Sequence, residues 1–133
     1  MADLAFRKSS RLLNSHDFKC VFEDAVYKVS HRHCLILARP NELDHPRLGL
    51  VIAKKNIRLA VQRNRVKRSI RETFRLKQHK LPNIDAIVLA RSQLDTLSDK
   101  ELHALFTKNW VRMIDKVKKQ TTDNADKASS PHA

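Results

Sequence analysis

Apolar residues recur along the chain with two different periods, and these periods predict the order of its helices and strands. Near the N-terminus they follow the i, i+3, i+4, i+7 spacing of one helix face, at Phe18, Val21, Phe22 and Ala25. Asn14 or Ser15 can cap this helix, and Asp17 then lies in the first turn, where the helix dipole favours a carboxylate. We therefore expect a short helix that begins near Asn14 or Ser15.

Three other apolar runs have the length and composition of strands. They cover residues 33–39, 47–55 and 84–90. A polar segment bounded by Pro40 and Pro46 separates the first two runs, which suits a hairpin loop rather than a continuing strand. The third run is almost wholly apolar, as expected of a strand that is covered on both faces.

Two later segments have the spacing of amphipathic helices. In residues 63–77 one arc of the helix collects Val66, Ile70, Thr73 and Phe74. Further on, Ser98 and Glu101 form a capping box, with Leu97 and Leu102 placed as a hydrophobic staple. The helix that follows carries an apolar stripe, at Leu102, Leu105, Phe106, Trp110, Met113 and Val117. We interpret this stripe as core; the alternative for Trp110 is a base-stacking platform.

The two ends of the chain lack this periodicity. We expect residues 1–7 to be a flexible N-terminus and residues 120–133 to be a disordered polar tail. Residues 8–119 contain no internal repeat and no linker, so they are predicted to form a single domain.

The charge of the chain is concentrated in one segment. Its 133 residues include 27 Lys and Arg against 14 Asp and Glu, which gives a net charge of +13. Eleven cations and one anion, Glu72, lie between Lys54 and Lys80, so that segment carries +10. Such a patch concentrates phosphates around a protein. The single glycine, Gly49, excludes the glycine-rich loops with which P-loop proteins, dinucleotide-binding folds and kinases hold phosphates.

The outward face of helix 63–77 carries like charges at helical spacing. Arg63, Lys67, Arg71 and Arg75 are each four residues apart, and each such pair costs about 0.2–0.5 kcal/mol. A bound polyanion removes this repulsion, and release of its counterions drives the association. Nucleic acid is therefore the expected partner, against the alternative of a merely solvated face. A helix that reads the DNA major groove and a general RNA-binding or ribosomal protein are two further interpretations of such a face. Membrane binding fits poorly, because the narrow apolar arc is needed for the core.

Two of these segments match a known signature. Arg47-Leu-Gly-Leu-Val-Ile-Ala-Lys-Lys55 and Arg63-Asn-Arg-Val-Lys-Arg-Ser-Ile-Arg-Glu-Thr-Phe-Arg75 closely resemble the bacterial ribonuclease P protein family. The likeness extends from Asp17 and Phe18 in the first helix to the last amphipathic helix.

The resemblance implies a fold and a function. The fold is expected to be α+β, a two-layer α/β sandwich with a central mixed sheet of about four strands, three helices and a left-handed β-α-β crossover, an exception to the usual rule. The protein is expected to be the non-catalytic subunit of an endoribonuclease that removes the 5′ leader of precursor tRNA. The RNA subunit performs this Mg²⁺-dependent hydrolysis. The expected partners are that catalytic RNA and precursor tRNA, with one protein monomer per RNA.

The resemblance also implies two RNA-binding surfaces. The catalytic RNA is expected to contact residues on and just before the basic helix: Lys54, Lys55, Arg63, Asn64, Arg65, Lys67, Arg68, Arg71 and Arg75. The leader is expected to enter a cleft between the first helix and the sheet, where Phe18 and Phe22 match aromatic positions and ungapped alignment places Ile36. Base stacking and simple core packing both remain open for Phe18 and Phe22, because their spacing suits either.

No other chemistry is indicated. The carboxylates are scattered and predict neither catalytic residues nor a metal site on the protein. His31 and His33 can share a strand face, but two ligands without distant partners make a weak metal site. Cys20 and Cys34 lack Cys-x-x-Cys spacing, so we interpret them as reduced core residues rather than a disulfide. No apolar run is long enough to cross a membrane and the N-terminus lacks an apolar signal segment, so we expect a cytoplasmic protein.

Overall fold

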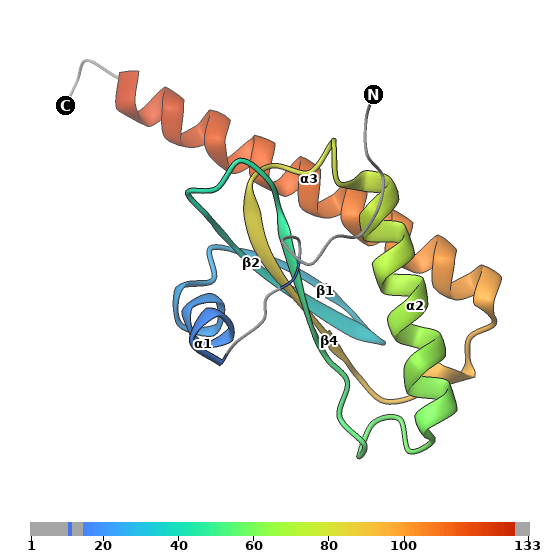
Figure 1. Cartoon of the computed structure of the whole chain (residues 1–133). Coiled ribbons are helices and arrows are strands. Elements are labelled where there is room, and N and C mark those ends of the chain that lie inside the picture. Colours follow the sequence, from blue (N-terminus) through green and yellow to red (C-terminus); the bar gives the residue numbers. More distant parts are fainter. Residues whose placement is uncertain (1–10, 12–14, 130–133) are drawn as a thin grey trace.

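A four-stranded mixed sheet forms the centre of the molecule (Figure 1). The computed structural model describes residues 11 and 15–129, with side chains through Gln120. The elements, in chain order, are α1 (Ser15–Asp24), β1 (Tyr27–His31), β2 (Cys34–Pro40), β3 (Arg47–Val51), α2 (Ala60–Lys77), β4 (Ile84–Ala90), the 3-10 turn η2 (Leu94–Thr96) and α3 (Asp99–Ser129). The strand order is β1-β2-β4-β3, with β3 parallel to β4 and the other pairs antiparallel. The expected mixed sheet with three helices is confirmed.

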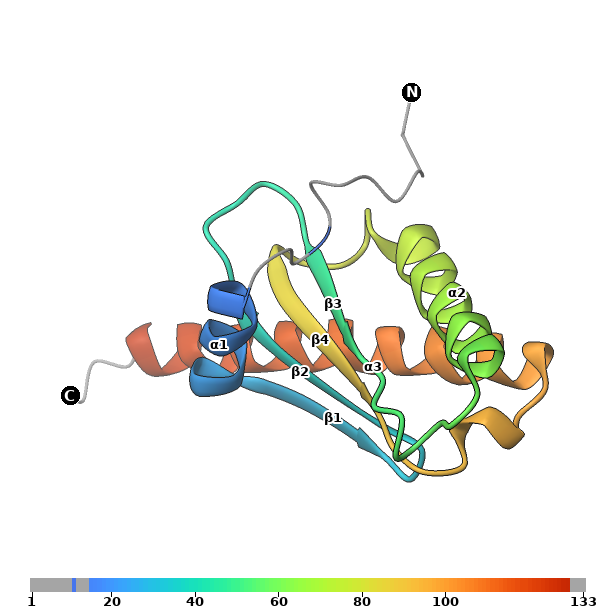
Figure 2. The same ribbon diagram turned by 60° about the horizontal axis from the view of Figure 1, so that its bottom comes forward.

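The helices cover the two faces of the sheet unequally. Helices α2 and α3 lie together on one face, and the short α1 lies on the other (Figure 2). Side chains alternate along each strand, so Ile36 and Val88 enter the core beneath α2 and α3, whereas Leu37 and Ile87 face α1. One face of the sheet is therefore deeply buried, and the other is only partly covered.

Helices α2 and α3 are joined through Trp110. Its ring meets Phe74 edge to face, with centroids 5.4 Å apart, and its indole N–H donates a 3.0 Å hydrogen bond to Thr73 Oγ1. Trp110 is fully buried, so its interpretation as a core residue is confirmed. The same contact explains why a threonine belongs to the buried arc of α2, since its hydroxyl satisfies an indole donor that has no access to water.

Most predicted elements are present, with three differences at the strands. Residues 40–46 do not close a hairpin as expected, because β4 lies between β2 and β3 in the sheet and pairs with both. β4 has the predicted bounds, α1 begins at Ser15, and the capping box of α3 is formed in both directions, at 2.9 and 3.1 Å between Ser98 and Glu101. The predicted strand 47–55 ends at Val51, because residues 52–59 turn away from the sheet to reach α2. The sequence pattern does not reveal β1, an edge strand of five residues in which only Tyr27 and Val29 are buried.

The C-terminal helix is longer than the predicted domain. α3 continues to Ser129, so residues 120–129 have helical backbone rather than the irregular chain expected after residue 119. Helix propagation adds one hydrogen bond per residue, and no proline or glycine interrupts this segment before Pro131. The predicted flexible N-terminus at 1–7, the possible cap at Asn14 and the last four residues of the predicted tail lie outside the described residues.

Candidate nucleic-acid interface

One side of α2 carries a row of polar and cationic side chains that points away from the core. Asn64, Arg68, Arg71 and Arg75 follow at i, i+4, i+7 and i+11, opposite the buried arc predicted from the sequence. Together with Arg11 and Glu72 they line a hollow of about 440 Å³, which we call the α2 hollow. Four of its six lining residues are arginines, whose planar guanidinium groups suit bidentate contacts with phosphate.

Arg11 reaches the α2 hollow from a distant part of the sequence. It forms a parallel β-bridge with Leu48, which sets it beside β3. The pKa of Arg71 is lowered from its ordinary value by partial burial and then by the charge of Arg11. The cations are therefore crowded enough to repel one another, and a bound anion relieves this repulsion. No periodicity marks Arg11 in the sequence, so only the folded chain reveals its place.

Two of the residues predicted to contact RNA make hydrogen bonds within the protein instead. Arg63 donates to the carbonyl oxygens of Ile57 and Arg58, at 3.1 and 2.8 Å, and so braces the loop that enters α2. Arg65 donates to Gln62 Oε1 at 2.8 Å, to Asp99 Oδ1 at 2.8 Å and to the carbonyl oxygen of Asp95 at 2.9 Å. Arg63 and Arg65 therefore hold the start of α2 against neighbouring segments and do not line the α2 hollow.

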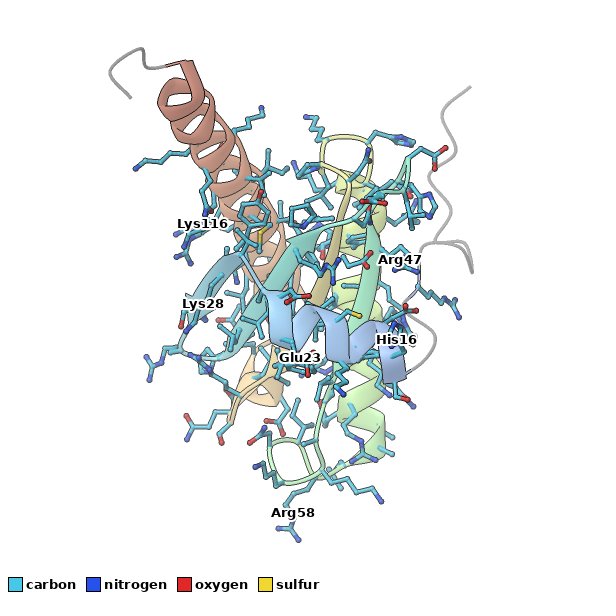
Figure 3. All side chains as sticks on the ribbon, turned by 90° about the vertical axis from the view of Figure 1, so that its left-hand side faces the viewer. His16, Glu23, Lys28, Arg47, Arg58 and Lys116 are labelled. Carbon is cyan, nitrogen blue, oxygen red and sulfur yellow. The ribbon has the colours of Figure 1, made fainter. Side chains whose placement is uncertain are left out.

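The remaining predicted lysines do not line the α2 hollow. Lys67 is half-buried on the flank of α2, and Lys54 and Lys55 are exposed in the turn after β3. Lys55 and Arg58 instead line a second hollow, of about 650 Å³, beside the start of α2; Figure 3 shows Arg58 at the tip of this loop. The start of α2 has no side-chain cap and no acidic residue in its first turn, so the positive end of the helix dipole adds to these charges.

The opposite face of the sheet carries the aromatic residues of α1. Phe18 packs with Leu37, Val51 and Leu89 around the buried pair Val21 and Ile87. Phe22 is 45% exposed at the margin of this cluster. We call this partly covered apolar surface the α1 face. Phe18 therefore contributes to packing, and Phe22 presents an aromatic ring to solvent.

The predicted position of Ile36 is wrong. Ile36 is fully buried in the core beneath α2 and α3, on the side of the sheet away from α1. Successive side chains of a strand point to opposite faces, so a shift of one residue moves a side chain across the sheet. Leu37 occupies the α1 face instead. The structure thus brings Phe18 near Leu37 and does not bring it near Ile36.

A charged network anchors the first turn of α1 to the sheet. Arg47 donates to both carboxylate oxygens of Asp85, at 2.8 and 2.6 Å, lies 3.7 Å from an oxygen of Asp17, and is seen beside the N-terminal end of α1 in Figure 3. Asn41 donates a further 2.9 Å hydrogen bond to Asp85. Burial opposes ionisation of Asp85, but the hydrogen bonds from Arg47 and Asn41 outweigh it and lower its pKa. The network fixes the orientation of α1 and hence of the α1 face.

The histidine pair predicted as a weak metal site has no third ligand beside it in the described part of the chain. Among residues 11 and 15–120, no group of three or more His, Cys, Asp or Glu side chains could hold a metal ion. The rings of His31 and His33 lie 5.6 Å apart, and the His33 backbone N–H donates to His31 Nδ1 at 3.1 Å. No helix in the described part of the chain is long and apolar enough to cross a membrane.

The two cysteines occupy different environments. Cys34 is buried, and burial raises its pKa to about 11. Cys20 is half-buried on α1, with its sulfur 3.6 Å from His16 Nε2. Both thiols are free, as expected, but only Cys34 belongs to the core.

Comparison with known proteins gives a consistent result. The sequence model of the Ribonuclease P family matches residues 6–114. The chain is 51% identical over 114 residues to the ribonuclease P protein component of Pseudomonas aeruginosa, covering 86% of this chain and 84% of that protein. It is 51% identical over 123 residues to that of Saccharophagus degradans, covering 92% and 91%.

Solved structures show the same likeness. The RNase P protein of Staphylococcus aureus superimposes with a TM-score of 0.70 at 28% identity, over 84% of this chain and 97% of that one. The RNase P protein of Thermotoga maritima gives a TM-score of 0.60 at 28% identity, over 74% and 96%.

Proposed function

The chain belongs to the ribonuclease P protein family, the protein subunits of a ribonucleoprotein endoribonuclease, and on this premise we propose that its two faces bind two different RNAs. The α2 hollow binds the catalytic RNA. The α1 face binds the 5′ leader of precursor tRNA. By holding both RNAs, the protein assists removal of the leader. One protein molecule acts with each catalytic RNA, in the bacterial cytoplasm.

The α2 hollow is the observation that carries the proposal. Its guanidinium groups come from Arg11, Arg68, Arg71 and Arg75 and crowd around one concave surface. Such a surface gains most from a folded RNA, because closely spaced phosphates can meet several cations at once and release their counterions. Neutralising RNA phosphates in this way lowers the Mg²⁺ concentration that the catalytic RNA needs to fold and act.

The protein supplies binding rather than chemistry. In this proposal the metal ions of the reaction are held by the RNA subunit. On the α1 face, the exposed ring of Phe22 supports stacking on an unpaired base, a contact worth about 1–3 kcal/mol. Because the mature tRNA lacks a leader, this contact favours substrate over product.

Reconstitution tests the proposal. The catalytic RNA is assayed for leader cleavage at low Mg²⁺, alone and with the full-length protein, and binding of leader-bearing and leaderless tRNA is measured in parallel. We expect the protein to restore cleavage and to strengthen binding of the leader-bearing form. A general RNA-binding or ribosomal protein, the alternative, would bind ribosomal RNA and show no preference between the two tRNA forms.

A further inference from the structure

A second cationic surface lies far from the α2 hollow, where α3 passes the edge strand β1. Lys108, Arg112, Lys116 and Lys119 follow at i, i+4, i+8 and i+11 along one side of α3. Arg112 and Lys116 donate to the carbonyl oxygens of Ser30 and Lys28 on β1. Lys28, Lys116 and Lys119 line a hollow of about 430 Å³ with Val26 and Gln120. We call these three lysines the edge patch; Figure 3 shows Lys28 and Lys116 on one side of the molecule.

The edge patch has more charge than the fold requires. Covering the free carbonyl groups of an edge strand is a structural role, and Arg112 and Lys116 fill it. The ammonium groups of Lys28 and Lys119 have no hydrogen-bond or ion-pair partner among the described residues. Three ammonium groups that line one small hollow repel one another, so a bound anion is favoured there.

The edge patch is continuous with the α1 face. Lys28 lies opposite Leu37 in the β1–β2 register, and Leu37 packs in the α1-face cluster, so Lys28 stands on that face at its margin. Phe22 and Val26, which are 45% and 51% exposed, lie between Phe18 and Lys28 along the chain. A single-stranded RNA that leaves the α1 face past the end of α1 therefore reaches the lysines of the edge patch.

Two carboxylates near the end of α1 each lie beside a cation. Glu23 lies 3.9 Å from Lys19, and Asp24 lies 3.2 Å from Arg39. A phosphate chain passing the end of α1 therefore meets paired carboxylates first and then the ammonium groups of Lys28 and Lys119, which have no partner among the described residues. Lysine suits this contact because it is a flexible point charge that makes no demand on base sequence or bidentate geometry.

We propose that the edge patch binds backbone phosphates of the precursor-tRNA leader, upstream of the nucleotides that lie on the α1 face. This inference rests on the proposed function of that face. It extends the leader path around the edge of the sheet and predicts that the protein contacts a longer stretch of leader than the α1 face alone can hold. The contact is electrostatic and independent of sequence.

The test uses the holoenzyme, reconstituted from the catalytic RNA and the full-length protein, and a series of precursor tRNAs whose leaders are lengthened one nucleotide at a time. The variant is Lys28→Gln with Lys119→Gln, because neither ammonium group holds the fold. The control is Lys100→Gln with Lys118→Gln, which removes the same charge from exposed positions on another side of α3. Dissociation constants are measured at several salt concentrations.

For the unmodified protein we expect affinity to rise with leader length and then level off. The variant should level off at a shorter leader, match the unmodified protein on the shortest leaders, and show a salt slope on long leaders that is shallower by about 1.4, or 0.7 per lost contact. The control should behave as the unmodified protein. Identical curves for variant and unmodified protein would overturn the inference, as would an equal loss on every leader. If the unmodified protein itself shows no leader preference, the proposed function fails instead.

Discussion

Arg65 on α2 and Asp99 in the first turn of α3 form a 2.8 Å ion pair that ties the two helices together. The guanidinium of Arg65 also donates to Gln62 and to the carbonyl oxygen of Asp95. Arg65 belongs to the most basic segment of the chain, yet its guanidinium makes hydrogen bonds within the protein. The density of positive charge alone therefore does not identify the residues that face RNA.

Replacing Arg65 by Ala should lower stability more than it lowers RNA affinity. The Arg65 and Asp99 side chains are 23% and 81% exposed, so solvent screens the pair, and we expect the free energy of unfolding to fall by about 1 kcal/mol. Asp99→Ala should produce part of the same loss. Urea unfolding of both variants measures it. A flattened salt slope of RNA binding with unchanged stability would show that Arg65 contacts RNA instead.

Replacing Arg68 and Arg71 by Gln should instead lower RNA affinity more than stability. Both side chains line the α2 hollow and lie within its crowded cluster of cations, so their removal should leave stability unchanged or raise it slightly. Catalytic-RNA binding should weaken, and its salt slope should become shallower by about 0.9 for each lost contact with helical RNA. Titrations at several salt concentrations, with Lys100→Gln/Lys118→Gln as the charge-matched control, provide the measurement. Equal slopes in both double variants would place the RNA elsewhere.

The sequence predicts an element well where its periodicity is strong. β4 and the start of α3 carry unambiguous apolar runs and cap signals, and both have the predicted bounds. β1 has too few alternating residues to be recognised. The pattern locates the strand that contains Ile36, but it does not show which face of the sheet each side chain of that strand occupies, because pairing with other strands sets this. The same limit applies to the site. The α2 arc follows from spacing, whereas the roles of Arg11 and Arg65 depend on partners thirty or more residues away.

Asp85 should make stability depend on acid pH. Its pKa is lower in the folded chain than in the unfolded one, so its contribution is complete above the unfolded value and disappears as pH falls through the folded value. Asp85→Asn should cost about 3 kcal/mol at pH 7, because it leaves the Arg47 charge without its main partner. The difference from the unmodified protein should shrink between about pH 5 and pH 3. Urea unfolding across this range would contradict the argument if the difference stayed constant.

The two cysteines should react at different rates. Cys34 is buried, and its pKa of about 11 keeps it as a protonated thiol at pH 8, whereas Cys20 is only half-buried on α1. A maleimide should therefore label one thiol per chain in the native protein and two in urea. Cys20→Ser should abolish the native labelling. Native labelling of Cys34 at a comparable rate would mean that the core beneath α3 opens readily.

Phe18 and Phe22 should separate packing from RNA binding on the α1 face. Phe18 packs against Leu37 and Leu89, so Phe18→Ala should lower the free energy of unfolding by about 2 kcal/mol or more. Phe22 is 45% exposed, so Phe22→Ala should cost less than about 1 kcal/mol and instead reduce the preference of the holoenzyme for leader-bearing over leaderless tRNA. Phe22→Tyr keeps an aromatic surface and should retain that preference. If Phe22→Ala loses stability but keeps the full preference, the ring is a packing residue and the leader binds without stacking on it.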